Sequence, residues 1–142
     1  MLRMKLLFLL AVIFVFSGTN VLACLCSSKG SENQRINKLK KTSDAVFVGT
    51  VIHVDRLIKD GSFVYRAVFR VEKTWKGNSL EVEVNTSTDC RVSFEEGKQY
   101  LIYAKENESK ELQTDVCMRS RPVGSGAVDL RKLGKPKVGY KP

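Results

Sequence analysis

Four cysteines carry the chemistry that is easiest to locate in this sequence. Two of them belong to the motif Cys24-Leu25-Cys26, which directly follows a hydrophobic leader, and Cys90 and Cys117 are the disulfide partners available elsewhere. Cleavage before Cys24 would place a free α-amino group, the Cys24 carbonyl and the apolar Leu25 side chain at one exposed tip. Bridged back to the body of the protein, such a tip could enter a metal-centred cleft.

The first 23 residues have the features of a secretory signal peptide. Arg3 and Lys5 precede an apolar run over 6–16, a polar break follows, and the small residue Ala23 suits signal peptidase. The apolar run is too short to cross a bilayer as a helix. We therefore expect an exported protein, which is secreted or, in a bacterium, periplasmic or held at the cell surface. The remaining residues are enough for one domain with one core.

The even number of cysteines in an exported chain predicts two disulfides. Three pairings are possible. A Cys24–Cys26 bridge would close a strained small ring, so we favour the two pairings that join the N-terminus to Cys90 and Cys117. A soft metal site of four thiolates is the alternative, but it needs closely spaced Cys-x-x-Cys pairs, and Cys90 and Cys117 are dispersed.

Hydrophobic periodicity predicts one helix followed by five strands. Ser31 is placed to cap a helix over 32–41. Strands are expected over 45–55, 63–75, 80–85, 98–105 and 111–118, with loops over 56–60 and 86–97 and a short helix over 128–133. This pattern favours an all-β fold with minor α content, and a small closed barrel rather than a sandwich.

The net charge of +9 is unevenly distributed along the chain. Residues 24–118 carry 15 Lys and Arg against 14 Asp and Glu, whereas residues 119–142 carry 7 against Asp129 alone. We place a nearly neutral domain over 24–122 and a basic C-terminal tail over 123–142. The tail either is a solvated segment that aids solubility or contacts an anionic partner such as a cell wall, a phospholipid or an acidic substrate.

Several of these features together resemble a known family. The leader that ends at a Cys-x-Cys motif, the helix, the apolar stretch Ser43–Thr50, the long strand that closes on Thr74–Gly77, and the later single cysteines Cys90 and Cys117 are similar to the tissue inhibitors of metalloproteinases and the wider netrin-like module. The animal inhibitors have a third disulfide in this domain and a second disulfide-rich domain. The chain therefore resembles the short, single-domain, bacterial form.

The resemblance implies a five-stranded OB-fold barrel, the disulfides Cys24–Cys90 and Cys26–Cys117, and inhibition of zinc endopeptidases by the mature N-terminus. The α-amine and carbonyl oxygen of Cys24 would chelate the catalytic zinc of the target, so the protein itself needs no cofactor. Leu25 would fill the pocket that receives the residue after the scissile bond. The other residues implied in protease binding are Cys26, Ser27, Ser28, Asp89, Cys90 and Arg91, beside ridges formed by the loops over 56–60 and 88–91.

Two other binding functions are compatible with parts of the sequence. Residues 21–24, Val-Leu-Ala-Cys, partly match a lipobox, and acylation of Cys24 would give a membrane-anchored, non-inhibitory netrin-like module without zinc chelation. OB barrels also bind oligonucleotides, but export, a neutral body and the lack of a basic-aromatic stripe argue against a nucleic-acid partner. We expect Tyr65, Phe69, Trp75, Tyr100 and Tyr103 in the core or on a barrel face.

An enzymatic function is not expected. His53 is the only histidine, and its place in an apolar strand predicts a hydrogen-bonded core residue. The sequence has no nucleophile elbow, phosphate loop, histidine pair or spaced carboxylate dyad. The acidic pairs at 81/83 and 95/96 are typical of a solvated strand face and a turn.

Overall fold

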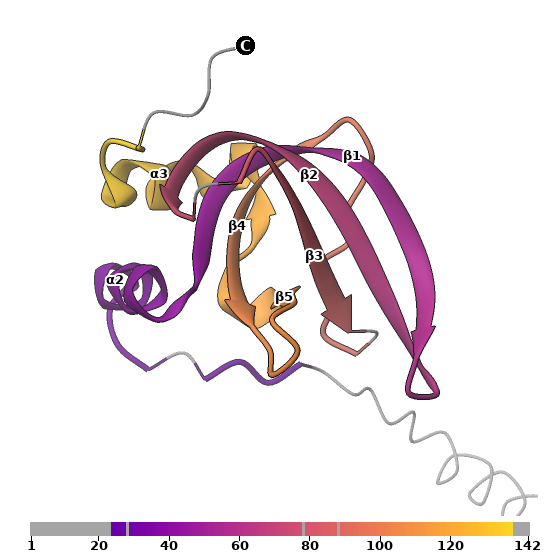
Figure 1. Cartoon of the computed structure of the whole chain (residues 1–142). Coiled ribbons are helices and arrows are strands. Elements are labelled where there is room, and N and C mark those ends of the chain that lie inside the picture. The colour runs from indigo at the N-terminus through magenta and orange to yellow at the C-terminus, as the bar shows by residue number, and fades with distance from the viewer. Residues whose placement is uncertain (1–23, 28, 78, 88, 138–142) are drawn as a thin grey trace, which may run out of the picture.

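The computed structural model describes residues 24–27, 29–77, 79–87 and 89–137, so the signal peptide expected over 1–23 and the end of the expected tail lie outside the described residues. The elements are α2 (Glu32–Thr42), β1 (Ala45–Lys59), β2 (Ser62–Lys76), β3 (Glu81–Ser87), β4 (Gln99–Glu106), β5 (Leu112–Gln113), η1 (Val116–Met118), β6 (Arg121–Pro122), η2 (Val123–Gly126) and α3 (Ala127–Leu133). The strands curve around a common centre, and both α-helices lie outside them (Figure 1).

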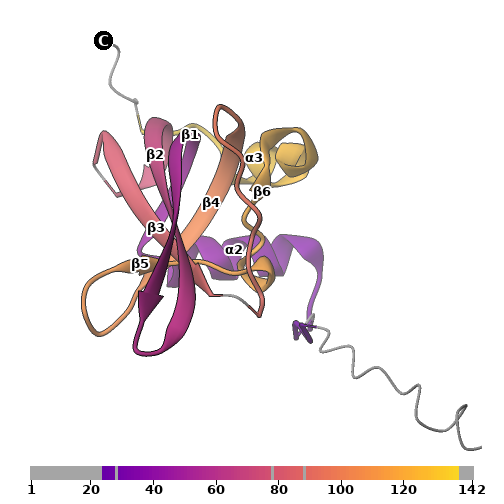
Figure 2. The same cartoon turned by 90° about the vertical axis from the view of Figure 1, so that its right-hand side faces the viewer.

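Five strands form a closed ring. Neighbours follow the order β1-β2-β3-β5-β4, and β4 returns to pair with β1 from Ala45 opposite Ala104 to Thr50 opposite Gln99. Every pair in the ring is antiparallel except β3 with β5. The short β6 pairs with Tyr100 and Leu101 of β4, which also pair with β1. The expected five-stranded OB-fold barrel with two flanking helices is confirmed (Figure 2).

Two hydrophobic cores lie on opposite faces of β1 and β4. The core inside the barrel comprises Ala45, Phe47, Val51, Ala67, Phe69, Val84, Tyr100, Ile102 and Ala104. The core between the barrel and the helices comprises Ile36, Val46, Val48, Trp75, Leu101, Tyr103 and Leu133. Successive side chains of a strand point to opposite faces, so the unbroken apolar runs of β1 and β4 serve both cores.

Helix α2 begins where the sequence predicts. The Ser31 side chain accepts a hydrogen bond from the Gln34 backbone N–H, and the Gln34 side chain accepts one from the Ser31 N–H, which together form a capping box. Ile36 is the residue of the helix that is fully buried. Burial of Ile36 therefore holds the helix against the barrel, and the capping box stabilises its first turn.

The prediction of a loop over 56–60 is wrong, because β1 and β2 continue as one long hairpin. Ile58 lies opposite Phe63 and Lys59 opposite Ser62, which leaves a two-residue turn at Asp60 and Gly61. Both turn residues have positive φ, at 50° and 75°. A turn with two positive φ angles matches the right-handed twist of the strands and keeps them paired to their ends.

The fifth strand is much shorter than expected. Its ladder covers Leu112 and Gln113 only, and the chain then enters η1. The Asp115 side chain accepts hydrogen bonds from the backbone N–H groups of Cys117 and Met118, at 2.7 and 3.0 Å. This cap turns the chain out of the sheet two residues after β5.

The folded part of the chain continues beyond Pro122, where the sequence analysis placed the end of the domain. Helix α3 buries Leu133 in the core between the barrel and the helices, and the Trp75 indole N–H donates to the Gly134 carbonyl at 2.9 Å. Asp129 is 1 % exposed, and its two oxygens accept hydrogen bonds from the Arg119 guanidinium at 2.6 and 2.9 Å. Arg119, one of the seven basic residues counted over 119–142, is therefore neutralised inside the domain.

Replacing Asp129 by Asn should destabilise the protein by about 3 kcal/mol, because it leaves the buried Arg119 guanidinium with the exposed Glu32 carboxylate as its remaining ion-pair partner. Guanidinium unfolding of the disulfide-bonded protein measures the change. Asp60→Asn, the same replacement in the exposed hairpin turn, should change the free energy of unfolding by less than about 0.5 kcal/mol. Equal stability of the two variants would show that the buried pair does not fix α3.

Candidate functional site

Two disulfides attach the N-terminal segment to separate parts of the barrel. Cys24 is bonded to Cys90 in the loop between β3 and β4, and Cys26 is bonded to Cys117 in η1, with Cα atoms 5.7 and 5.2 Å apart. Both pairings implied by the resemblance are present. All four sulfurs are used, so the alternative of a four-thiolate metal site is excluded. The indigo segment before α2 runs along the lower end of the barrel (Figure 1).

Leu25 stands out from this clamped segment. Its side chain is 95 % exposed, although the cysteines on both sides are partly buried. The Cys24 carbonyl accepts a hydrogen bond from the Cys26 N–H at 3.1 Å, which fixes its direction and leaves it a second lone pair. The segment thus presents an apolar side chain and a carbonyl oxygen on a constrained backbone.

The loop that carries Cys90 is itself anchored to the barrel. The Tyr100 hydroxyl, from β4, donates to the Ser93 carbonyl and accepts from the Glu95 N–H, both at 3.1 Å. The Phe94 ring packs edge-on against Phe69 and Tyr100, with centroids 5.1 Å from each. These contacts join the loop to the core inside the barrel. Cys90, the disulfide partner of Cys24, is therefore itself held in place.

The residues expected in protease binding flank Cys24, as far as the structure describes them. The Asp89 carbonyl oxygen lies 3.1 Å from the Cys24 sulfur. The Arg91 guanidinium lies 4.6 Å from the centre of the Tyr65 ring, within cation–π distance. Ser27 is exposed beside Cys26, and Ser28 lies outside the described residues. Tyr65 is half-buried on the barrel face, which is one of the two places that the sequence analysis allowed.

Val116 lies beside the candidate site, and the sequence analysis did not single it out. It is exposed, and its N–H donates to the Cys90 carbonyl at 3.0 Å, which links the two cysteine-bearing loops. It was missed because the sequence analysis placed it within a strand expected over 111–118. The Asp115 cap two residues before Cys117 was the signal for a turn at this point.

The ridge expected from a loop over 56–60 is instead the tip of the β1–β2 hairpin. The tip lies at the same end of the barrel as the clamped segment, but in Figure 2 the two are apart. Ile58 there is largely exposed, and the Arg56 guanidinium lies 4.9 Å from the centre of the Phe63 ring. The structure thus brings Cys24 next to the loop with Cys90, and leaves the hairpin as a separate projection.

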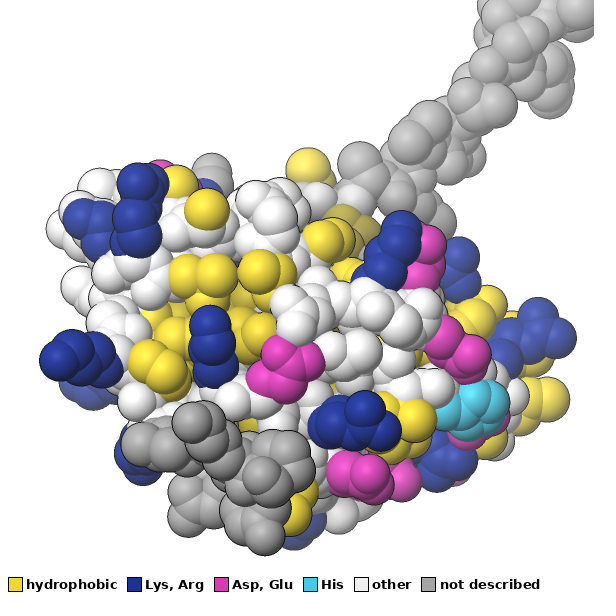
Figure 3. Space-filling view, turned by 90° about the horizontal axis from the view of Figure 1, so that it is seen from above, with side chains coloured by type: hydrophobic (Ala, Val, Ile, Leu, Met, Phe, Trp, Pro, Cys, Tyr) yellow, Lys and Arg dark blue, Asp and Glu magenta, His cyan; other side chains and the backbone are white. Residues whose placement is uncertain are grey.

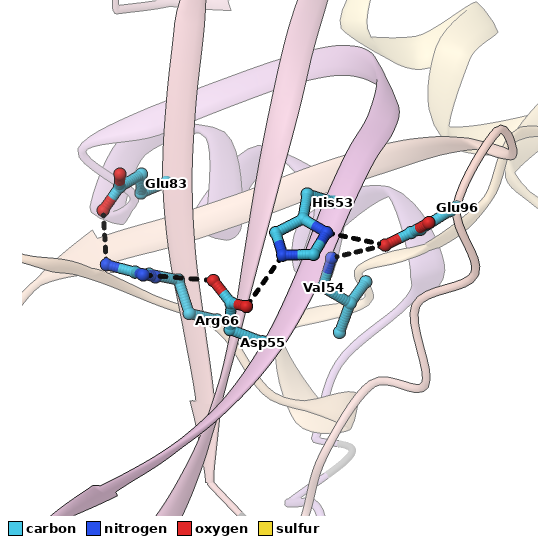
Figure 4. Close-up of polar contacts among 6 residues, drawn as sticks. All are labelled: His53, Val54, Asp55, Arg66, Glu83 and Glu96. Atoms are coloured by element: carbon cyan, nitrogen blue, oxygen red, sulfur yellow. Dashed lines mark hydrogen bonds and ion pairs between the residues drawn. The ribbon is translucent and has the colours of Figure 1, made fainter.

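The prediction that His53 is a core residue is wrong. Its side chain is 57 % exposed, with Nδ1 2.9 Å from the Glu96 carboxylate and Nε2 2.7 Å from the Asp55 carboxylate (Figure 4). The cause is a shift in the β1–β2 pairing between Val51 and His53. An extra residue in one strand reverses the alternation beyond it, so Val54 faces the core and His53 faces solvent.

The His53 cluster ties β1 to the loop with Cys90. Glu96 also accepts a hydrogen bond from the Val54 N–H, and Asp55 pairs with Arg66, which in turn reaches Glu83. Hydrogen bonds to Glu96 and then Asp55 raise the pKa of His53 above its ordinary value of 6.5. Both ring nitrogens can donate only when the imidazole is protonated, so the complete cluster belongs to the imidazolium form.

Charges of both signs are mixed on the protein surface. On the face seen from above, Lys and Arg side chains lie on both halves, whereas most Asp and Glu side chains lie on the right-hand half, towards the His side chain (Figure 3). Nowhere in the described part of the chain are three His, Cys, Asp or Glu residues grouped to hold a metal ion. No helix within the same residues is long and apolar enough to cross a membrane. The two disulfides are consistent with an extracellular protein.

Comparisons with known proteins do not assign the chain to a family. No family model matches it, and a search of curated proteins finds no significant match. The resemblance to the tissue inhibitors of metalloproteinases therefore rests on the motifs and stays a prediction.

Titration of His53 should change the stability of the loop that carries Cys90. Because the folded-state pKa is raised, the stabilisation should be complete below pH 6.5 and should be lost as the pH rises through that folded-state value. NMR titration of the imidazole, with thermal unfolding at pH 5.5 and 8.5, measures both quantities. The variant His53→Gln should lack this part of the pH dependence. A His53 pKa at or below 6.5 would contradict the cluster.

Proposed function

We propose that the mature protein is a secreted inhibitor of zinc metalloendopeptidases that uses residues 24–26 as its reactive segment. The observation that carries this proposal is the 95 % exposed Leu25 side chain between two disulfide-bonded cysteines. A large apolar side chain that is exposed on an already ordered backbone can fill a partner's pocket with little further loss of conformational entropy. The proposed partner supplies the zinc, and the inhibitor has neither a cofactor nor an enzymatic activity of its own.

The proposed metal contact uses backbone atoms of Cys24. A catalytic zinc keeps one coordination position for water beside three protein ligands. The α-amine and the carbonyl oxygen of an N-terminal residue form a five-membered chelate and can replace that water together. The amine binds in its neutral form, and an ordinary α-amino pKa of roughly 7.7 to 8.0 makes loss of its proton inexpensive near neutral pH.

Rigidity supports the same proposal. The disulfides close chain segments with sequence separations of 66 and 91 residues, and chain-entropy estimates for such loops are about 4 to 5 kcal/mol each as upper values. A segment that is already ordered loses less conformational entropy on binding. The hydrogen bonds that hold the loop with Cys90 and cap η1 extend this order to both anchor points.

The lipoprotein alternative makes different use of the same sulfur. An acylated Cys24 carries its lipid on the atom that is bonded to Cys90, and its amine is no longer free. The disulfide-bonded form therefore favours inhibition over membrane anchoring. An anionic partner for the C-terminal basic residues remains a prediction. Among the described residues of the tail, the exposed basic side chains that would contact it are Arg131, Lys132, Lys135 and Lys137.

One added residue tests the chelate. Refolded protein that starts at Cys24 should inhibit one or more members of a panel of zinc endopeptidases. The same protein with one alanine before Cys24 should lose inhibition, because the α-amine moves away from the Cys24 carbonyl. Matching NMR spectra of the two proteins would control for the fold. Equal potency of both forms would refute the mechanism.

Leu25→Ala tests the apolar anchor. The variant should lose about 2 kcal/mol of the binding free energy that comes from burying the leucine side chain, which weakens inhibition roughly 20- to 30-fold. The inhibition constant against the most sensitive endopeptidase measures this change. Leu80→Ala is a matched control, because Leu80 is another exposed leucine and lies just before β3. Its inhibition constant should not change. The same loss in both variants would remove Leu25 from the interface.

A further inference from the structure

Seven exposed basic residues gather at the C-terminal ends of three elements. They belong to the last turn of α2, to the last turn of α3 with the chain after it, and to the end of β2: Lys40, Lys41, Lys73, Arg131, Lys132, Lys135 and Lys137. We call this set the basic face. It lies on the side of the barrel that the two helices cover, and the β1–β2 hairpin projects from the opposite side (Figure 1).

Hydrogen bonds hold these three ends together. The Lys40 ammonium donates to the Leu133 carbonyl at 3.0 Å, which joins α2 to α3. The Lys137 N–H donates to the Thr74 carbonyl at 2.7 Å, which joins the chain after α3 to β2. The basic residues of the three elements therefore belong to one surface.

Lys73 lies on the side of the sheet that faces the helices. It is paired with Val48, whose side chain belongs to the core between the barrel and the helices. Residues directly opposite each other on neighbouring strands have their side chains on the same face of the sheet. The Lys73 side chain is therefore on the same side as the lysines of α2 and α3.

The positive charge of the basic face is not neutralised within the described residues. None of the seven side chains forms an ion pair there. The acidic residues of α2 and α3 are Glu32 and Asp129, and both pair with Arg119. In Figure 3 the left-hand half, which is the side of α3 in Figure 1, likewise shows Lys and Arg side chains but few Asp and Glu side chains.

Stabilisation of the helices does not account for the whole basic face. Cations in the last turn of a helix interact favourably with its dipole, which explains the four residues in the last turns of α2 and α3. The three residues outside the helices, Lys73, Lys135 and Lys137, have no such role. A concentration of one sign of charge beyond this need indicates an anionic partner.

The side chains on this surface disfavour two kinds of anionic partner. Among the described residues, the exposed large apolar side chains lie on other elements, and none belongs to α2 or α3. Single-stranded nucleic acids are therefore disfavoured, because their bases stack on aromatic side chains. A membrane is disfavoured because no apolar side chain is placed to enter it, and because a flat surface reaches only the cations in one plane. A flexible chain can follow the cations from α2 to α3 and β2.

The prevalence of lysine indicates which kind of chain. Six of the seven residues are lysines, and an ammonium group is a point charge on a flexible stem, whereas arginine recognises anions of fixed geometry through a planar fork. Lysines therefore suit a polymer whose anionic groups adjust independently of one another. Phosphodiesters joined by short acyclic units have this property, because their linking bonds rotate, whereas the sulfates of a glycosaminoglycan are fixed on stiff sugar rings.

We infer that the basic face binds a flexible polymer of phosphodiester groups without bases, such as a poly(glycerol phosphate) chain. Residues 24–26 are not part of this face, so the binding does not rest on the proposed inhibition. A protein bound in this way would be held on an anionic polymer by its helix side.

NMR titration of the ¹⁵N-labelled, disulfide-bonded protein with a short poly(glycerol phosphate) chain tests the inference. Signals of the last turns of α2 and α3 and of the end of β2 should shift. The affinity should fall about tenfold or more between 50 and 200 mM salt, because binding releases counterions. No shift on the basic face, or shifts confined to another face, would overturn the inference. So would tighter binding of a heparin hexasaccharide, a thymidine octamer or phosphatidylglycerol vesicles.

Two matched double variants link binding to this face. Lys132→Gln with Lys135→Gln should weaken binding about tenfold and reduce the slope of the logarithm of affinity against the logarithm of salt by about 1 to 2. Lys105→Gln with Lys110→Gln makes the same change of charge at exposed positions around the β4–β5 turn and should bind normally. An unchanged affinity of the first variant, or an equal loss in both, would overturn the inference.

Fold and inhibition are controlled separately. All four substituted lysines are exposed, so the dispersed spectrum of each variant should match that of the parent protein. The protein with an added N-terminal alanine should bind poly(glycerol phosphate) normally. Failure of the inhibition test therefore leaves this test unaffected.

Discussion

Two sulfur bridges determine the position of the segment on which the proposed function depends. Residues 24–27 belong to no helix or strand, and they lie before the first element of the domain. Their place is set by Cys24–Cys90 and Cys26–Cys117, which join them to two connections on the same barrel. With only one bridge the segment could rotate about that bond. Because Leu25 is the single residue between the two bridged cysteines, its backbone is held at both ends. Its side chain points into solvent.

The bridges act only because the barrel also orders the two connections. Tyr100 holds the loop with Cys90 from inside the barrel, and Asp115 holds η1 by capping it. The His53–Glu96 contact adds a third support that depends on pH. These supports come from side chains of β1, β4 and the chain after β5. The OB barrel is thus the scaffold that holds the two connections in place as anchor points for residues 24–26.

Much of this architecture could be predicted from the sequence, because it follows from local patterns. Ser31 and Gln34 mark the start of α2, and the apolar runs of β1 and β4 mark strands buried on both faces. The errors arose where tertiary geometry overrides the pattern. The pairing shift after Val51 reverses the face of His53, and no feature of the sequence reveals it. The pairing of the cysteines followed from the resemblance, since spacing alone left two choices.

The coordination of Cys24 to a target's metal is the central claim, and pulsed EPR of a cobalt-substituted zinc endopeptidase tests it most directly. Cobalt(II) occupies such sites and reports the nuclei bound to it. With ¹⁵N-labelled protein that begins at Cys24, the complex should show a hyperfine coupling from one directly bound ¹⁵N nucleus, which unlabelled protein lacks. A stable complex whose spectrum is the same with labelled and unlabelled protein would contradict the account, because the α-amine would then lie away from the metal.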